Sequence, residues 1–389
     1  MRIPLLIMNM DFFDWVSSHH GHRGVVPTEQ AFRDFVQLCA DKGFDTMFFR
    51  TSVAGRVCYP SQVMTPFGRE YRLNSNYLRD VMDQWNPLEV AIDACRKSGL
   101  NVYAWVSLFD SYCPGLEDHF FADHPELLMR SRDDKQAMRG VPCYACEDTR
   151  EYRLREAREL AEYGADGVFY SVHSHTFCGS FESDPREENA FGFNREAVDE
   201  YQNRHGVNII EQDFDPLLLA RVHGDALTDY LRLARDELNR HDQGMLMTYR
   251  WRHDGGEHGH GETMTWLGYA RDRAGYPYLH QVGVHLDCET WVRDNLVDGL
   301  FAQADYVDEV EQIRARTGGG RFYLWVYCGF DQTTVRRRRP TIERMIEDVY
   351  NSPLTGLTFH EELSFEYCCP ELWDLIADNA PRFRTAKGE

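Results

Sequence analysis

Short apolar runs alternate with longer amphipathic stretches along almost the whole chain, and glycine-containing turns separate one unit from the next. The apolar runs have the length of buried strands, and the stretches between them have helical spacing. The predicted strands are residues 3–10, 45–50, 101–107, 167–172, 244–251, 297–303, 321–327 and 356–360. The predicted helices are residues 28–42, 87–98, 149–163, 194–205, 216–239, 289–295, 307–316 and 341–351, followed by one last helix.

Capping residues support several of these boundaries. Thr28 is suited to the N-cap of its helix, and Gly43 follows the end of that helix. Pro87 opens the next helix and Gly99 stops it, which matches the usual positions of proline and glycine. Pro340 marks the predicted start of the helix at 341–351. The four arginines of 336–339 are expected in a solvent-exposed segment that leads into this helix.

Eight strand–helix units with few hairpin signals predict an α/β protein, a (β/α)₈ TIM barrel with loop insertions. Residues 1–389 are expected to form one domain, with a helical insertion at about 179–243. A content of 43% hydrophobic residues suffices for a large core. An open doubly wound sheet is the alternative fold, but no GxGxxG follows the first strand, which disfavours a dinucleotide site.

The charge balance narrows the set of partners. Lys and Arg number 42 against 63 Asp and Glu, a net charge of −21 that would repel nucleic acids and anionic membranes. No apolar window reaches the length of a membrane span, and the first apolar run is too short for a signal peptide. We therefore expect a cytoplasmic protein, and a homo-oligomer is compatible with this composition. Its 11 cysteines, including the Cys143–x–x–Cys146 motif and adjacent Cys368 and Cys369, are expected to be free thiols.

Polar side chains follow all eight predicted strands, while the strand bodies are apolar. In this fold chemistry occurs at the carboxyl ends of the strands, and buried polar groups are costly unless they are satisfied. A ring of such groups predicts a functional site at the mouth of the barrel. Aromatic rings there would stack on the faces of a sugar, and polar groups would bind its hydroxyls. The predicted substrate-binding residues are Asn9, Asp11, Arg50, Trp105, His173, His175, Arg250, Gln303, Trp325, Tyr327 and His360.

Glycoside hydrolysis normally requires two carboxylates. Glu361 and Glu362 close the eighth strand, where partial burial would raise the pKa of either group and suit it to acid catalysis. Asp110 is the first choice for the partner, and Asp11 and Asp305 are further candidates. The predicted catalytic residues are therefore Glu361, Glu362 and Asp110.

Metal and serine chemistry have weaker support. His253, His258 and His260 lie in a loop without a recognised ligand spacing, and His173 and His175 with Asp11 are a second possible set. Ser171 lacks the GxSxG context of a serine hydrolase. No metal and no cofactor is predicted.

Four segments in order resemble the family-10-like glycosyl hydrolase proteins, a largely uncharacterised bacterial group of TIM barrels. They are NPLEVAIDACRKSGLNVYAW (86–105) with FADHPE (121–126), ADGVFYSVHSH (165–175), FGFN (191–194) with EY (200–201) and HGV (205–207), and TWV (290–292) with LVDG (296–299). The resemblance implies a carbohydrate-active barrel with a pocket near His173, His175 and Glu361 or Glu362. Many relatives of this type have an acidic residue at the fourth strand end, where this chain has Ser171 and His173.

The first hypothesis is therefore a glycoside hydrolase that acts on an oligo- or polysaccharide by carboxylate acid/base catalysis. A non-catalytic carbohydrate-binding barrel and a histidine-based, metal-dependent hydrolase or isomerase are the alternatives. The sequence predicts neither the sugar, the linkage nor the stereochemical outcome.

Overall fold

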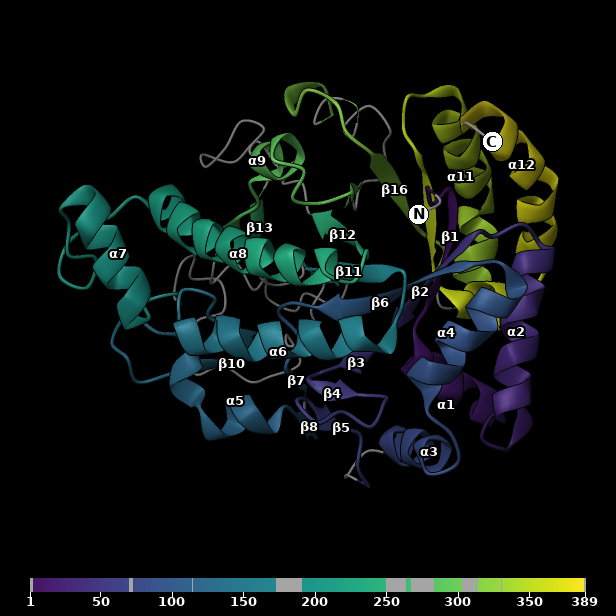
Figure 1. Ribbon diagram of the computed structural model, residues 1–389, viewed down its shortest axis with the longest axis horizontal. Helices are drawn as coiled ribbons and strands as arrows, with labels where there is room; N and C mark the ends of the chain where they lie inside the picture. Colours follow the sequence, from purple (N-terminus) through teal and green to yellow (C-terminus); the bar gives the residue numbers. More distant parts are fainter. Residues whose placement is uncertain are drawn as a thin grey trace.

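The computed structural model describes residues 3–69, 73–113, 115–172, 191–249, 264–266, 283–302, 311, 314–329 and 331–387. A closed barrel of eight strands forms its centre, and every neighbouring pair of strands in the barrel is parallel (Figure 1). The predicted TIM-barrel fold is confirmed. In order around the ring the strands are β1 (Leu6–Met10), β2 (Thr46–Arg50), β6 (Asn101–Ser107), β11 (Gly167–Ser171), β12 (Gly244–Tyr249), β15 (Gly299–Ala302), β16 (Phe322–Tyr327) and β17 (Gly356–His360).

The register of these strands brings their carboxyl ends together. Arg50 at the end of β2 lies opposite Trp105 of β6, and Tyr327 at the end of β16 lies opposite His360 at the end of β17. β1 pairs with both β2 and β17, which closes the ring between the first and last barrel strands. Polar residues that are far apart in sequence therefore share one mouth.

Helices surround the barrel (Figure 1). α2 packs against α4, α6 against α8, and α1 against α3. Figure 1 shows α7 at the end of the long axis farthest from α12. The helices are α1 (Phe12–Arg23), α2 (Glu29–Asp41), α3 (Leu73–Met82), α4 (Pro87–Ser98), α5 (His119–Asp123), α6 (Glu147–Tyr163), α7 (Arg195–His205), α8 (Pro216–Asn239), α9 (Cys288–Arg293), α11 (Gln332–Asn351) and α12 (Glu371–Lys387), with a 3₁₀ turn η1 (Pro125–Leu127) and a π-helical turn η3 (Ser364–Cys368).

The sequence analysis missed α1, α3 and α5 and placed the start of α11 too late. α1 was not predicted, because its buried residues are interspersed with histidine, serine and aspartate and give a weak apolar stripe. The predicted start of a helix at residue 341 is wrong, because α11 begins at Gln332 and contains Pro340. Asp331 caps it by accepting a hydrogen bond from the Thr334 amide at 2.9 Å. Proline is common in the first turn of a helix, but Pro340 lies well inside α11, which begins after the N-cap residue Asp331.

Small sheets extend the loops that follow the barrel strands, and the sequence pattern did not predict them. The small strands lie in the loops after β2, β6 and β12, all of which start at the carboxyl ends of their barrel strands. The small strands are β3 (Ser52–Val53), β4 (Arg56–Val57), β5 (Thr65–Pro66), β7 (Tyr112–Cys113), β8 (Leu116–Glu117), β9 (Leu128–Arg130), β10 (Ala137–Pro142), β13 (Met264–Trp266) and β14 (Gly283–His285).

Aromatic side chains fill the inside of the barrel. Phe48 stacks on Phe169 with ring centroids 4.0 Å apart, and Phe301 stacks on Tyr323 at 4.3 Å. The interior cluster consists of Ile7, Phe48, Tyr103, Trp105, Phe169, Leu246, Phe301, Tyr323 and Trp325. The barrel is therefore a packed core rather than a pore, and a substrate can only be bound at its mouth.

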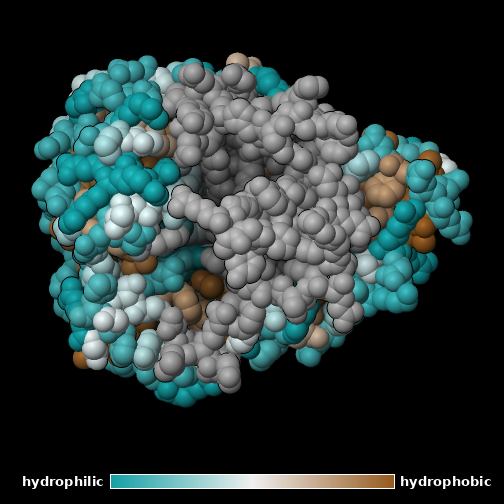
Figure 2. Space-filling view, turned by 180° about the vertical axis from the view of Figure 1, so that it is seen from behind, coloured by the Kyte–Doolittle hydropathy of each residue, from teal (hydrophilic) through white to brown (hydrophobic). Residues whose placement is uncertain are grey.

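The hydrophilic surface is consistent with the high content of charged residues. Figure 2 shows one face on which the described residues are mostly hydrophilic, with hydrophobic residues scattered among them. None of the helices that the structure describes is long and apolar enough to cross a membrane.

The first prediction concerns glycine at the start of a barrel strand. A Cβ on Gly167 would lie 2.2 Å from the Gly244 carbonyl oxygen and 2.6 Å from the Tyr103 ring. Gly167→Ala is expected to lower the free energy of unfolding by roughly 1–3 kcal/mol, because the barrel must shift to admit the methyl group. Urea unfolding measures this change.

Gly21→Ala is the matched control, because a Cβ on Gly21 in α1 would have no atom within 4 Å. Alanine favours a helix over glycine, so this variant is expected to gain about 0.5–1 kcal/mol. Equal effects of the two substitutions would contradict the close packing of β11 against β12.

Candidate active site

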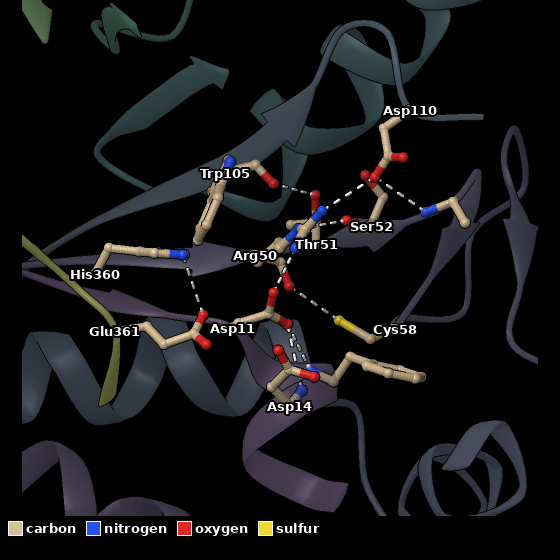
Figure 3. A network of polar contacts seen from close by, with 12 residues as sticks. Asp11, Asp14, Arg50, Thr51, Ser52, Cys58, Trp105, Asp110, His360 and Glu361 are labelled. Carbon is tan, nitrogen blue, oxygen red and sulfur yellow. Dashed lines mark hydrogen bonds and ion pairs between the residues drawn. The ribbon is translucent and has the colours of Figure 1, made fainter. Parts of the chain in front are cut away.

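Arg50 lies at the centre of a buried network of charges at the mouth (Figure 3). Its Nη1 forms an ion pair with Oδ2 of Asp11, and its Nη2 lies 3.0 Å from Oδ2 of Asp110. Its Nε donates to the Ser52 carbonyl oxygen at 3.0 Å. The three charged side chains are at most 3% exposed. Removal of one partner of a buried ion pair costs about 3–5 kcal/mol, so this network fixes the ends of β1, β2 and β6 relative to one another.

Asp11 joins the first and last barrel strands. Its Oδ1 accepts hydrogen bonds from the backbone amides of Phe13 at 3.2 Å and Asp14 at 3.4 Å, which caps α1. Its own amide donates to Oε2 of Glu362 at 3.0 Å. Asp11 therefore connects the start of α1 to the segment that follows β17.

Asp110 lies on the other side of Arg50 from Asp11 and Glu361 (Figure 3). Its Oδ2 also accepts a hydrogen bond from the Ala54 amide at 3.2 Å, and its side chain is fully buried. These contacts tie the loop after β6 to the loop after β2. The predicted partner carboxylate is thus separated from Glu361 by the guanidinium group.

Glu361 is the carboxylate closest to the histidine of β17. Its Oε2 lies 3.7 Å from Nε2 of His360, and the residue is only 1% exposed. Its Oε1 has no hydrogen-bond partner among the described residues. Burial raises the pKa of Glu361 well above its usual value, and the neighbouring Glu362, Asp14 and Asp11 raise it further, which the Arg50 charge only partly offsets.

Glu362 is fully buried beside it. Burial, together with Asp11 and Asp14, raises the pKa of Glu362 well above its usual value. In a strand that continued past His360, Glu362 and not Glu361 would share the face of His360. β17 ends at His360, so the alternation does not continue, and both carboxylates approach the Asp11 side of the mouth.

The predicted aromatic residues form a layer beneath the charges. The Arg50 guanidinium lies 4.9 Å from the centre of the Trp105 ring, and Trp105 is only 1% exposed. Trp325 lies 5.2 Å and Tyr327 6.2 Å from the His360 ring, between ring centroids. Tyr327 is half-buried, whereas Trp105 lies in the barrel interior and supports Arg50.

The remaining predicted residues divide into two groups. Asn9 is fully buried, and its Oδ1 accepts a hydrogen bond from the Thr358 hydroxyl of β17. The other group, His173, His175, Arg250 and Gln303, together with the further candidates Asp305, His253, His258 and His260, lies outside the described residues.

Asp14 is the residue of this site that the sequence analysis missed. It lies in the first turn of α1, a helix that was not predicted. A signal was present, because Asp11 follows an apolar strand and Asp14 comes three residues later, which is typical of an N-cap and an acidic first turn.

Asp11, Asp14 and Glu361 are the group of described residues best arranged to hold a metal ion. One carboxylate oxygen from each lies within 4.8 Å of the others. Oxygen atoms of this kind are the ligands that Mg²⁺ and Ca²⁺ prefer. Arg50 already neutralises one of the three, which reduces the attraction of the group for a cation.

A cavity of about 320 Å³ lies at the opposite end of the barrel, where the strands begin. Pro4, Gly244 and Asp298 line it, with the ion pair between Arg235 and Asp298 at its edge. Barrel enzymes have their active sites at the carboxyl ends of the strands, so the Arg50 network and not this cavity is the candidate site.

Comparison with known proteins supports the fold. No family model matches the sequence, and no curated protein matches it, so the resemblance to family-10-like proteins stays a prediction. The chain is similar in structure to the catalytic domain of β-amylase from Paenibacillus polymyxa, with a TM-score of 0.59 and 10% identity over 97% of this chain and 98% of that one. It is also similar to the PgaB (BpsB) glycoside hydrolase domain from Bordetella bronchiseptica, with a TM-score of 0.55 and 12% identity over 96% and 99%.

A third similar structure is β-galactosidase from the psychrophilic Marinomonas ef1, with a TM-score of 0.52 and 10% identity. It is the larger chain, since the match covers 97% of this chain but 59% of that one. The shared feature is the TIM-barrel fold, because identities this low do not extend to individual residues.

The second prediction follows from the pKa of Glu361. A carboxyl group whose pKa is raised on folding contributes most stability at low pH and loses it as the pH rises through its folded pKa. Gln cannot ionise, so Glu361→Gln is expected to gain stability over the unchanged protein as the pH rises. The gain is about 1.4 kcal/mol for each unit of pKa shift, and thermal unfolding between pH 4.5 and 8 measures it.

Glu347→Gln is a control of opposite sign. Hydrogen bonds from Arg382 and Asn351 lower the pKa of the exposed Glu347, so its carboxylate stabilises the fold above its unfolded pKa and loses this effect as the pH falls. This variant is expected to lose a little stability at neutral pH and none at acid pH. A pH-independent difference between Glu361→Gln and the unchanged protein would contradict the raised pKa.

Proposed function

We propose that the protein is a glycoside hydrolase that acts on an oligo- or polysaccharide by carboxylate acid/base catalysis at the carboxyl end of the barrel. The observation that carries the proposal is Glu361, a buried carboxyl group with a raised pKa and a second carboxylate close by. Similar folds in the glycoside hydrolase domain of PgaB and in β-amylase support the proposal.

Glu361 has the properties of the general acid. A raised pKa favours the protonated form of this carboxyl group, so the group can protonate the glycosidic oxygen as the bond to the sugar breaks. His360 Nε2 lies 3.7 Å from Glu361 Oε2, which places the imidazole ring beside the carboxyl group. After the leaving group departs, the same carboxylate can accept a proton from water.

We propose Asp14 as the second catalytic carboxylate. In Asp11, Oδ1 caps α1 and Oδ2 pairs with Arg50, so both oxygens are engaged. Asp110 lies beyond Arg50 and is fully buried, which suits it to hold the guanidinium group. Asp14 is half-buried and has an oxygen within 4.8 Å of one of Glu361. Retaining enzymes hold their carboxyl groups about 5–5.5 Å apart, so this separation favours retention of configuration.

Substrate recognition is assigned to the rim of the same mouth. Tyr327 is half-buried beside His360, so part of its side chain is accessible to a sugar ring. Arg50, Asn9, Asp11, Trp105 and Trp325 would act mainly by holding the floor of the site in place. His173, His175, Arg250 and Gln303 remain proposed sugar-binding residues on the basis of the sequence.

The third prediction tests this assignment. A panel of aryl glycosides and oligosaccharides identifies a substrate, and Glu361→Gln is then expected to lower kcat by about 10²–10⁴-fold, because proton donation is lost. The loss should be much smaller on a dinitrophenyl glycoside, whose leaving group departs without a proton. Asp14→Asn is expected to abolish turnover on both kinds of substrate.

Asp110→Asn and Glu362→Gln are the comparison variants. Both are expected to retain more activity than Glu361→Gln, although Asp110→Asn should unfold more easily because Arg50 loses a partner. If Glu361→Gln and Asp14→Asn keep full kcat, the assignment of the acid and its partner is wrong. Sugar binding without turnover in the unchanged protein would favour a carbohydrate-binding barrel instead.

The carboxylate group Asp11, Asp14 and Glu361 makes a metal-dependent hydrolase the second candidate. The two functions make opposite predictions for chelators. Dialysis against EDTA should leave kcat unchanged if Glu361 is a proton donor. A loss of activity that Mg²⁺ or Ca²⁺ restores would favour the metal-dependent reaction.

A further inference from the structure

The Cys143–x–x–Cys146 motif forms a tight turn between β10 and α6. Tyr144 and Ala145 are the central turn residues, and the Cys146 amide donates to the Cys143 carbonyl oxygen at 3.1 Å. The first and last Cα atoms of a β-turn lie within about 7 Å of each other. Disulfides span Cα separations of about 4.4–6.8 Å, so the turn has a suitable backbone.

The two thiols are free and lie against each other. The Cys146 thiol is in hydrogen-bonding contact with Cys143 Sγ, and Cys146 Sγ also lies 3.4 Å from Oε2 of Glu196 in α7. The side-chain amide of Asn194 lies 3.7 Å from Cys146 Sγ. The Cys146 thiol donates to this carboxylate, and Cys143, burial and Glu196 together raise the pKa of the Cys146 thiol, so Cys146 is the protonated member of the pair, with Glu196 as its nearest proton acceptor.

His223 of α8 completes the group. Its ring lies near enough to Cys143 to affect the thiol, and its Nε2 lies 2.9 Å from the Gly192 carbonyl oxygen. Its Nδ1 is buried and has no hydrogen-bond partner in the described part of the chain. Burial raises the pKa of the Cys143 thiol, but the neighbouring Cys146 and the His223 ring outweigh burial and lower this pKa below its usual value.

We propose that Cys143 and Cys146 are a redox-active pair that forms a disulfide on reaction with a low-molecular-weight disulfide. The Cys143 thiolate attacks one sulfur of the reagent, a mixed disulfide forms, and one thiolate leaves. Cys146 gives its proton to Glu196 and attacks Cys143 Sγ, which expels the second thiolate. Two protein thiols are oxidised and one reagent disulfide is reduced to two thiols.

The other buried cysteines provide the contrast. Cys39, Cys95 and Cys328 are as deeply buried as Cys143, but burial raises the pKa of each of these thiols, and they remain protonated at neutral pH. Thiolates and not thiols are the nucleophiles in disulfide exchange. Burial alone therefore does not decide which cysteine reacts, and the neighbours of Cys143 single it out.

The turn is also connected to the loop that carries Asp110. The Tyr144 hydroxyl donates to the Leu108 carbonyl oxygen at 3.0 Å, and the Ser111 amide donates to the Gly140 carbonyl oxygen at 2.9 Å. A change in the turn would reach Asp110 through these bonds. The redox chemistry itself does not rest on the proposed glycosidase function.

The fourth prediction uses the intact chain and bis(2-hydroxyethyl) disulfide, a small reagent suited to buried thiols. Trypsin releases Cys143 and Cys146 together on the peptide of residues 140–150, and Cys95 alone on the peptide of residues 80–96. After incubation under native conditions and blocking of the remaining thiols, peptide 140–150 is expected to be lighter than its reduced form by two hydrogen atoms. Peptide 80–96 should carry only the blocking group.

Two variants test the order of the steps. Cys146→Ser is expected to hold the mixed disulfide on Cys143, seen as one hydroxyethylthio group on peptide 140–150. Cys143→Ser is expected to leave Cys146 unmodified, because the attacking thiolate is missing. His223→Gln should slow the first step at least tenfold without changing the product.

Three outcomes would overturn the proposal. They are no disulfide on peptide 140–150, modification of Cys95 at the same rate as Cys143, and equal reactivity of Cys143 and Cys146 in the two serine variants. A zinc ion bound to the pair in native mass spectrometry would also overturn it, since the thiols would then be metal ligands.

Discussion

The ion pairs of Arg50 with Asp11 and Asp110 are the interaction on which the mouth of the barrel depends. A fully buried guanidinium group needs compensating charge, and the two carboxylates that supply it come from the ends of different barrel strands. Asp11 begins α1 and contacts the segment after β17, and Asp110 is anchored to the loop after β2. One cation thus determines how four chain segments meet, and Glu361 takes its position within that frame.

The same network separates two kinds of carboxylate. Asp11 and Asp110 face the guanidinium group. Glu361 is buried among other carboxylates, and both its burial and their charge raise its pKa. A carboxyl group with a raised pKa beside an ion-paired carboxylate is the usual basis for a division between acid and partner. The aromatic rings under Arg50 contribute by filling the barrel, so that the charges remain at its opening.

The fold was predictable because its signal is repeated eight times. The bounds of β6, β17, α4 and α8 agree with the sequence analysis, since apolar runs and caps mark them clearly. α1, α3, α5 and the small sheets were not predicted; the buried residues of α1 form no clear apolar stripe, and most of the small strands have only two or three residues. The site was predictable only in part. The strand ends predicted Arg50, Asp11 and Glu361 as candidates. Which carboxylates lie close together is decided by the loops, which place Asp110 against Arg50 and Asp14 near Glu361.

The closure of the barrel between its first and last strands has a consequence for biosynthesis. The Asp11 amide and the Glu362 carboxylate that binds it are separated by 351 positions in the sequence. A ribosome-bound chain that has released β1 and β2 holds Arg50 and Asp11 but lacks the acidic pair beyond β17. The complete mouth therefore assembles only after β17 and the segment behind it have been synthesised, and shorter nascent chains hold Arg50, Asp11 and Asp14 without Glu361 and Glu362.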